Sequence, residues 1–424
     1  MMTATIDRHE GGLGLEAAGG ARPGATCSVL EDDGAVGRIA GPWRELLAAS
    51  GTDEPMMSPT WAASWWEVFG GTEGRALRVG VVRDGGRLVG IAPFVARTHW
   101  YGGALPFRRV ELVGTGEGPE DEVCSEYVGV IAERGAEARV AEAVAEALVR
   151  GQFDAWDEVY LPGMNAGTPM PEALASSLRR RGIDVEITTE GEAAVAVLEP
   201  TWEAWLAALP ARHRYAVTRS LRDFDRWAEG TGRVDVVATE AELPRATEAL
   251  VELHESRWRG SAVAHGAFRS ARFRAFHEIL MPRLLAKGAL DLSLLSAFGA
   301  PVGVLYAIRW GRRVAYYQSG RRTDLPDAVR PGMVLHAHAI QRAIAAGCQE
   351  YDLLGGSARF KRTLSQSTRT LVRLRAVRPG LLETTRRLAT VELRRARTAW
   401  DSLRRTLGSG HEAKPEPDDH DEPR

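Results

Sequence analysis

The chain has 424 residues, 44% of them hydrophobic, a length that predicts about two or three domains with sizeable cores. Its formal net charge of −2 provides no overall basic surface, so no nucleic-acid partner is expected. The three cysteines, Cys27, Cys124 and Cys348, are far apart and odd in number, which argues against a disulfide framework or a Cys-x-x-Cys metal site. No run of about 18 apolar residues and no apolar N-terminal leader is present. A soluble, cytoplasmic protein with no metal and no membrane span is therefore expected.

The first half reads as a mixture of short helices and strands. The segment SPTWAASWWEVFG, residues 58–70, predicts a helix with a Ser-Pro start and a tryptophan face that belongs to the core. Residues 77–97, LRVGVVRDGGRLVGIAPFVAR, are typical of a hairpin with a polar turn. Further strands and an alanine-rich amphipathic helix at residues 136–151 follow.

The second half repeats this order. A helix at residues 246–258 precedes hairpin-connected strands at 290–320, a helix at 331–347 and the strand EYDLLGG. The likeness of DGGRLVGIAPFV to AFGAPVGVLYAI suggests two copies of one unit, with Gly90 equivalent to Gly303. The predicted segments are a disordered N-terminus 1–25, domains 26–198 and 199–378, a C-terminal helix 379–408 and a disordered acidic tail 409–424.

An ordered set of motifs resembles a known family. The set comprises SPTWAASWW, LVGIAPFV, SEYVGV, LHESRW and RPGMVLHAHAIQRAIAAGCQEYDLLGGSARFK. Together they resemble, over roughly residues 40–375, the cellulose-biosynthesis-type acetyltransferases, a branch of the GNAT superfamily related to the Fem peptidyltransferases. The resemblance implies an α/β fold of two tandem GNAT-like domains with mixed, largely antiparallel sheets plus a C-terminal helix. It also implies acyl-CoA chemistry in the second domain.

The second half contains residues suited to bind acetyl-CoA or another acyl-CoA. YYQSG is a strand ending in glycine, whose edge can splay and expose backbone groups. At RPGM, proline suits a first helical turn and glycine lets the free N–H groups approach a pyrophosphate. The usual GNAT loop Q/R-x-x-G-x-G/A is missing, and an ordinary helix start accounts for the same residues. The candidate cofactor contacts are Gln318, Ser319, Gly320, Arg330, Gly332 and Met333.

The catalytic candidates begin with Lys361, which follows a Gly-Gly bend in a chain with few lysines. The lysine could hold a phosphate, stabilise an oxyanion, move a proton or lie on the surface. The family often shows an acid, then Leu or Phe, Gly, and an aromatic residue before Lys, and YDLLGGSARFK fits that order. Asp352 is the acid in reach, either as general base or as the group that orients Lys361. Tyr317 and His254 complete the set.

Acceptor contacts are predicted in both halves. His254, Arg257 and Trp258 have i, i+3, i+4 spacing and share a helical face, which suits either an acceptor pocket or a partly buried Trp with a stacked Arg. Glu126 and Tyr127 follow a glycine-rich loop and could reach a cleft between the domains. Such a loop is also a common flexible connector.

The sequence as a whole predicts an acyltransferase that acts on an amine or hydroxyl of a small or sugar-linked acceptor, with a role in exopolysaccharide biosynthesis as one setting. In this mechanism Asp352, or a water it holds, deprotonates the acceptor, while donors near Gln318 and Lys361 stabilise the oxyanion. A Fem-type aminoacyl or peptidyl transferase and a non-catalytic scaffold in polysaccharide synthesis are the alternatives. The C-terminal helix is expected to dock on the body or on a partner copy as a homodimer.

Overall fold

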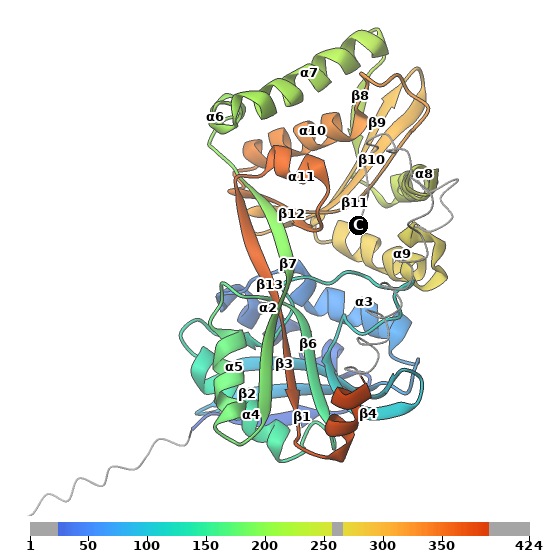
Figure 1. Cartoon of the computed structure of the whole chain (residues 1–424). Helices are drawn as coiled ribbons and strands as arrows, with labels where there is room; N and C mark the ends of the chain where they lie inside the picture. The colour runs from blue at the N-terminus through green and yellow to red at the C-terminus, as the bar shows by residue number, and fades with distance from the viewer. Residues whose placement is uncertain (1–23, 257–265, 390–424) are drawn as a thin grey trace, which may run out of the picture.

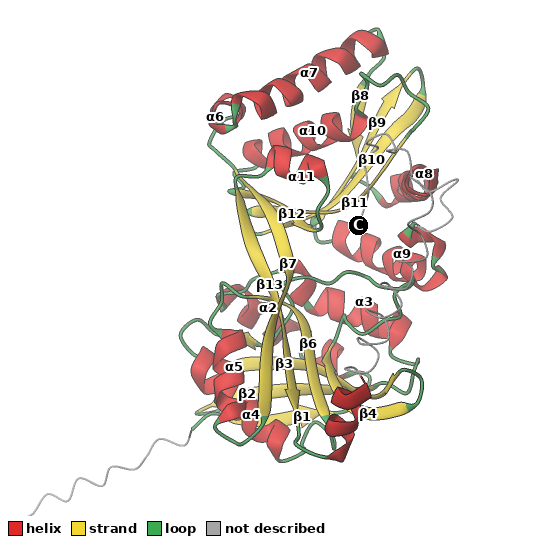
Figure 2. Ribbon diagram, viewed as in Figure 1, coloured by secondary structure: helices red, strands yellow, loops and turns green. Residues whose placement is uncertain are grey.

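The computed structural model describes residues 24–256 and 266–389, and its strands form a 13-stranded sheet with helices on both faces (Figures 1 and 2). The strands are β1 Thr26–Leu30, β2 Ala76–Asp84, β3 Arg87–Tyr101, β4 Leu105–Leu112, β5 Ile131–Ala132, β6 Glu158–Asn165, β7 Asp184–Val197, β8 Arg233–Val236, β9 Leu290–Ala297, β10 Ala300–Trp310, β11 Arg313–Arg321, β12 Glu350–Gly355 and β13 Ser367–Val377. The α-helices are α1 Ala35–Arg38, α2 Ala40–Ala49, α3 Pro59–Phe69, α4 Glu137–Val149, α5 Met170–Arg179, α6 Trp202–Ala208, α7 Ala211–Ala228, α8 Leu243–Ser256, α9 Ala271–Leu285, α10 Pro331–Ala345 and α11 Arg359–Leu364. Short 3₁₀ turns are η1 Pro55–Met57, η2 Glu240–Glu242 and η3 Ala267–Arg269.

One supersecondary unit occurs twice in the sheet. In the first half, β2, β3 and β4 are antiparallel neighbours, and after α4 the chain returns as β6, parallel to β4. In the second half, β9, β10 and β11 are antiparallel, and after α10 the chain returns as β12, parallel to β11. The mixed, largely antiparallel α/β fold predicted from the sequence is therefore confirmed.

Two glycines at matching positions show why the hairpin sequences look alike. A Cβ on Gly90 in β3 would lie 2.5 Å from Cγ1 of Val140 in α4, and a Cβ on Gly303 in β10 would lie 2.8 Å from Cδ1 of Leu335 in α10. Each glycine lets its crossover helix pack directly on the middle strand. The sequence likeness thus reflects the same helix-on-strand contact in both halves.

Strands β7 and β13 connect the two halves (Figure 1). Strand β13 pairs with β6 on one side and with β7 on the other, from Ser367 opposite Val195 to Val377 opposite Asp184, although it comes from the C-terminal part of the chain. Strand β7 also pairs with β12. The domain boundary near residue 198 remains a prediction, because β13 lies among strands of the first half.

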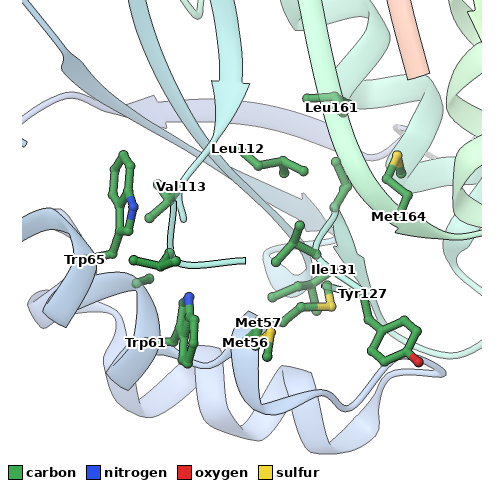
Figure 3. Packing of buried hydrophobic residues seen from close by; sticks show 14 of the residues in the cluster. Met56, Met57, Trp61, Trp65, Leu112, Val113, Tyr127, Ile131, Leu161 and Met164 are labelled. Carbon is green, nitrogen blue, oxygen red and sulfur yellow. The ribbon is translucent and has the colours of Figure 1, made fainter. Parts of the chain in front are cut away.

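The first half has an aromatic core around α3 (Figure 3). The Ser58 side chain accepts a hydrogen bond from the Trp61 N–H and starts the helix, with Pro59 in its first turn. Trp61 and Trp65 are fully buried, so the predicted tryptophan core stripe is confirmed. Tyr127 lies at the edge of this cluster, with its hydroxyl pointing away from the other side chains.

The sheet of the second half is covered on both faces. Tyr306 and Ile308 of β10 share a core with α8 and α9, whereas Leu305 and Ala307, on alternate positions, pack with α7 and α10. Helix α9 also packs on α3 of the first half, where Trp61 meets the ring of Phe276 at 5.0 Å between centroids. This contact holds the first-half loops against the second-half sheet.

The predictions for the chain ends fall almost wholly outside the described residues. Residues 381–389 are helical, at the start of the predicted C-terminal helix 379–408, and the remainder of that helix lies beyond the described part. The same is true of nearly all of segment 1–25 and of the tail 409–424. None of the described helices combines the length and apolar character needed to cross a membrane.

Candidate functional site

Strands β11 and β12 separate before they end. They pair in parallel only from Arg313 to Ala315 and from Glu350 to Asp352, although β11 continues to Arg321 and β12 to Gly355. The register of β11 against β10 shifts at Tyr317, which is an extra residue in that strand. Beyond Ala315, the backbone N–H and C=O groups of β11 on this side are therefore not used by β12, although the carbonyl oxygens of Ser319 and Arg321 are bonded to the α8 side chains of His254 and Ser256.

Asp352 fixes the end of β12. Its carboxylate accepts hydrogen bonds from the Leu354 N–H at 2.8 Å, from the Tyr127 hydroxyl at 3.3 Å and from Arg369 Nη1 at 2.8 Å. Leu354 has a φ of 57°, a left-handed conformation that is uncommon for a non-glycine residue and marks local strain. Burial raises the pKa of Asp352, and the bonds from Leu354 and Arg369 oppose that rise. With all these donors, Asp352 serves as an anchor of the strained turn.

The turn after Asp352 directs one backbone donor toward the first half of the chain. Both carboxylate oxygens of Glu126 accept from the Gly355 N–H, at 2.9 and 2.8 Å. A Cβ on Gly355 would lie 2.7 Å from Glu126 Oε1, so a glycine is needed for this approach. The hydrogen bond joins residues 229 positions apart in the sequence.

Lys361 returns from α11 to the same turn. Its Nζ donates to the carbonyl oxygen of Gly355 and, at 3.4 Å, to that of Leu354. The side chain is buried, and burial lowers the pKa of Lys361, while the negative charges of Glu126 and Asp352 oppose that change. The sequence thus placed Lys361 correctly beside the Gly-Gly bend, and the structure adds a carboxylate from the other half.

Glu126 has the electrostatics of a group that changes protonation near neutral pH. Burial raises its pKa to about 7, and the Gly355 N–H and the Lys361 charge limit the rise. Unlike Asp352, Glu126 is partly exposed. A carboxylate with a pKa near the working pH and some access to solvent suits proton transfer.

The loop that carries Glu126 is tightly constrained. Cys124 and Tyr127 both have left-handed φ values, 48° and 60°. The side chain of Ser125 accepts from the indole N–H of Trp61 at 2.9 Å, and the Glu126 N–H lies 3.0 Å from the sulfur of Met56. Strained backbone that is held on several sides is common at binding and catalytic sites.

The end of β11 brings together five of the predicted residues. Gly320 faces α8 so closely that a Cβ would lie 2.5 Å from the His254 N, and His254 Nδ1 lies 3.0 Å from the Ser319 carbonyl oxygen. The Tyr317 hydroxyl donates to the Val123 carbonyl oxygen at 2.6 Å. His254 and Tyr317 therefore hold the β11 end against α8 and the Glu126 loop, and neither is bonded to Lys361. Gln318, which pairs with Tyr306 of β10, lies in the part of β11 that β12 no longer contacts.

Helix α10 begins beside the same strand end. Arg330 is its exposed N-cap residue and makes no side-chain cap bond, Pro331 occupies the first turn, and Met333 packs against the core of the α7–α10 face. The nearest atom to a Cβ on Gly332 would be Cδ of Arg321, at 3.9 Å. The first N–H groups of α10 thus have space and two arginines nearby, as an anion requires. Arg257 and Trp258, the predicted acceptor residues, lie outside the described residues.

Several residues near the site escaped the sequence analysis. His336 of α10 is buried, bonds to the Tyr351 hydroxyl at 2.9 Å and stacks on Phe360, beside Lys361. Burial, with the Lys361 charge, lowers the pKa of His336 to about 3, so its ring is neutral. The alternation of His and Ala in LHAHA is a weak signal that did not distinguish this histidine from an ordinary core residue.

A second missed group is the buried carboxylate of Glu54, which pairs with Arg313. Burial raises the pKa of Glu54 to about 7, and Arg313 opposes the rise. Arg369 links Asp352 to Glu350 through bonds of 2.8 and 2.6 Å. Ion pairs thus link Asp352, through Arg369, Glu350 and Arg313, to Glu54 of the first half.

Residues 211–362 match the acetyltransferase (GNAT) domain family. No similar sequence is found among curated proteins. Among solved structures, FemX superposes with a TM-score of 0.58 and 10% identity over 82% of this chain and 97% of FemX. A conserved protein of unknown function from Bacteroides thetaiotaomicron VPI-5482 gives a TM-score of 0.54 and 11% identity over 82% of this chain and 100% of that protein. A tandem GNAT protein from the clavulanic acid biosynthesis pathway gives 0.44 and 13% identity, over 84% and 99% of the two chains.

The match to the GNAT family and the likeness to FemX agree with the architecture seen above. The match to the GNAT family covers the second repeat from α7 to α11, including the diverging strands and Lys361. The FemX likeness extends over both halves and concerns the fold. The second half of the chain is therefore similar to the GNAT acetyltransferase domain, within a fold like that of FemX.

Proposed function

We propose that the chain is an acyltransferase that moves an acyl group from acyl-CoA, acetyl-CoA in the first instance, to an amine or hydroxyl of a small or sugar-linked acceptor. The observation that carries the proposal is the divergence of β11 and β12 after Ala315 and Asp352, with Glu126 and Lys361 at the open end. A GNAT-type domain over the same residues supports it. Fold alone does not fix an activity, so the proposed activity depends on the residues of this site.

The residues present fit an acyl-CoA. The part of β11 around Gln318 and Gly320, which β12 does not contact, offers backbone partners for an extended chain that contains amides, whereas the Ser319 carbonyl oxygen is already bonded to His254. The start of α10 at Gly332, with Arg330 and Arg321 nearby, suits a pyrophosphate. Acyl-CoA would supply the acyl thioester, and the chain would bind it, orient it and manage the protons.

Glu126 is the proposed general base. Its pKa of about 7 leaves a large fraction ionised at neutral pH, and it is partly exposed. Asp352, the base favoured from the sequence, is fully buried and already accepts from three donors, so we assign it the role of positioning the turn. Lys361, buried beside Glu126, would keep positive charge near the carboxylate and lower its pKa.

The biological role of the chain, its family type, its location, its oligomeric state and its domain boundaries belong to the proposal as well. A role in exopolysaccharide biosynthesis and membership of the cellulose-biosynthesis type rest on the sequence resemblance, and the GNAT match does not distinguish them. The cytoplasmic location follows from the cysteine usage, and the homodimer from the predicted C-terminal helix. The division into domains 26–198 and 199–378 is likewise proposed. The likeness to FemX keeps a Fem-type aminoacyl or peptidyl transferase as the second candidate.

A transfer assay with the purified full chain tests the proposal. Acyl-CoA donors of increasing chain length are combined with panels of amines, amino sugars and hydroxyl acceptors, and release of the CoA thiol is followed. Acceptor-dependent thiol release is expected, and it should fall at least a hundredfold in Glu126→Gln. Transfer from aminoacyl donors with none from acyl-CoA would favour the Fem-type reaction, and a chain that neither binds nor transfers would favour the scaffold.

A further inference from the structure

A loop of the first half, residues 113–130, carries Glu126 and stands in the place of a strand segment. The register pairs on either side of it are Phe94 with Leu112 and Ile91 with Ile131, and the corresponding pairs of the second half are Ala307 with Tyr316 and Val304 with Gly320. With Gly90 equivalent to Gly303, these pairs match one to one. This Glu126 loop therefore stands where the second half has only residues 317–319 of β11.

The Glu126 loop is held by side chains rather than by strand pairing. Residues 317–319 lie along β10, whereas residues 113–130 form neither helix nor strand. Within the first half, two arginine side chains donate to the Gly116 carbonyl oxygen at 2.7 and 2.9 Å, and the Trp61 indole N–H donates to the Ser125 hydroxyl at 2.9 Å. The stretch between these two anchors depends on contacts to the second half.

Asp121 fixes the middle of the Glu126 loop to the start of α9. Its Oδ1 accepts from the Ser270 hydroxyl at 2.5 Å, and its Oδ2 accepts from Arg272 Nη1 at 3.1 Å. Ser270 is the N-cap residue of α9 and accepts from the Phe273 N–H at 3.0 Å, so its one hydroxyl proton is given to Asp121. The Arg272 side chain is 49% exposed, so solvent screens the ion pair and the Ser270 hydrogen bond is the firmer contact.

The contact of Asp121 is isolated on its part of the loop. Among residues 118–122, Asp121 has the only side chain that hydrogen-bonds to another part of the described chain. The next contacts to the second half, at Val123 and Glu126, follow two and five residues later. Loss of the Asp121 contact would therefore loosen the segment that leads directly to Glu126.

We propose that Asp121 is a positioning residue for acyl transfer, which holds the Glu126 loop on the start of α9 and so keeps Glu126 beside Lys361. The inference deepens the proposed function and rests on it, because Glu126 is the base of that reaction. Asp121 makes no hydrogen bond to Glu126 or Lys361 in the described part of the chain, so it acts through the backbone between residues 121 and 126.

Kinetics of two variants test this role. Asp121→Ala removes the acceptor for Ser270 and should lower kcat at least tenfold, because a displacement of about 1 Å can lower a rate on the order of a hundredfold. KM for acyl-CoA should stay at the wild-type value, since the proposed acyl-CoA contacts lie on β11 and α10. Asp121→Asn keeps an oxygen that accepts from Ser270 and should restore most of kcat. A higher KM with normal kcat in Asp121→Ala, or an equal loss of kcat in both variants, would contradict the proposal.

The pH dependence separates a displaced Glu126 from a general loss of stability. Burial is the main cause that raises the Glu126 pKa to about 7, and the charged groups around it are Lys361, Asp352 and Glu122. A loosened loop brings the carboxylate into water, so the rise of kcat/KM should move to lower pH in Asp121→Ala. A rise at the wild-type pH would show that Glu126 has not moved and would contradict the proposal.

Asp53→Ala is the matched control. Asp53 is also a first-half carboxylate that accepts from the second half, from the Trp310 indole N–H at 2.6 Å, but it lies outside the Glu126 loop. Its loss should leave the pH dependence of kcat/KM unchanged. An equal shift in Asp53→Ala and Asp121→Ala would assign the effect to the contact between the halves in general and overturn the role of Asp121.

Alkylation of Cys124 reports the position of the loop without any substrate. The Cys124 side chain has accessible surface, yet burial around the thiol, with the nearby charges of Glu122 and Glu126, raises its pKa to about 12. Because the thiolate is the reactive form, iodoacetamide at pH 8 should modify Cys124 at least tenfold faster in Asp121→Ala than in wild type or Asp53→Ala, as followed by mass spectrometry. Equal rates would overturn the proposal whatever the transfer assay shows. Faster alkylation in Asp121→Ala, with no acyl transfer by wild type, would refute the proposed function and leave Asp121 as the tether of the loop.

Discussion

The carboxylate of Glu126 and the backbone N–H of Gly355 join the two halves of the chain through hydrogen bonds of 2.9 and 2.8 Å. One residue comes from a strained loop of the first half and the other is the last residue of β12. Because Lys361 bonds to the carbonyl oxygen of the same glycine, a single peptide segment positions both charged side chains. The site thus depends on the contact between the halves.

Gly355→Ala tests the geometric need for this contact. The added Cβ would meet Glu126 Oε1 at 2.7 Å, so the carboxylate must move and its bond to the N–H must lengthen. We expect a loss of about 1–3 kcal/mol in the free energy of unfolding, measured in urea. Gly191→Ala in β7, where no atom lies within 4 Å of the new Cβ, is the control. Equal stability of the two variants would show that the Glu126 contact is loose.

The pH dependence of the reaction should report Glu126. A base with a pKa of about 7 must lose its proton to act, so kcat/KM should rise with pH below about 7 and level off above it. Glu126→Gln should abolish this rise of kcat/KM with pH, whereas Glu120→Gln, an exposed residue of the same loop, should keep it. Lys361→Met should move the rise of kcat/KM to higher pH, because the lysine charge lowers the Glu126 pKa. An unchanged pH dependence of kcat/KM in Glu126→Gln would assign the base to another group.

Glu126 should also affect stability without any substrate. Its pKa in the folded chain, about 7, is above the usual 4.5, so the folded state binds the proton more tightly than the unfolded state does. This stabilising contribution is full below about pH 4.5 and is lost as the pH rises through 7. The stability difference between wild type and Glu126→Gln, measured by urea unfolding at several pH values, should change across this window. A constant difference would mean that the Glu126 pKa is ordinary.

Lys361→Ala should lower kcat by about a hundredfold if the lysine supplies charge to the transition state, since one such donor is worth ~3 kcal/mol. Lys361→Arg should restore little, because a planar guanidinium does not replace an ammonium that fits between two carbonyl groups. Arg362→Ala, the exposed neighbour, is the control. A higher KM with normal kcat would indicate ligand binding only. Wild-type kinetics in Lys361→Ala would leave the lysine with a purely structural role.

Asp352→Asn distinguishes an anchor from a base. Loss of its charge leaves Arg369 with Glu350 alone, so we expect the unfolding free energy to fall by about 2–4 kcal/mol. Asp324→Asn, in an exposed pair with Arg322, should change it far less, because solvent screens that pair. Turnover of the folded Asp352→Asn protein should fall less than that of Glu126→Gln. The reverse order would restore Asp352 as the base.

Local sequence signals predicted much of the fold. The Ser58-Pro59 helix start, the hairpins and the paired Gly90 and Gly303 depend on contacts within one repeat, and the structure has them all. The position of β13 between β6 and β7 could not be read in this way, because strand pairing across the whole chain leaves no local pattern.

The site was predictable only in part, because contacts between distant parts of the chain leave no local sequence pattern. Asp352 and Lys361 belong to one segment and could be found together, but the donors that turn Asp352 into an anchor come from Tyr127 and Arg369 as well as from Leu354. The raised pKa of Glu126 depends on burial that arises only when the halves meet.

Calorimetric titration of acetyl-CoA into the full chain measures most directly whether the diverging strands and the start of α10 form an acyl-CoA site. Wild type should bind one equivalent, and Gly332→Glu should bind at least tenfold more weakly, because the new carboxylate crowds and repels the pyrophosphate while the space around Gly332 lets the fold persist. Gly41→Glu, the second residue of α2 as Gly332 is of α10, should bind like wild type. Acetyl-CoA affinity that is unchanged in Gly332→Glu, or no binding by the wild-type chain, would contradict the proposed site.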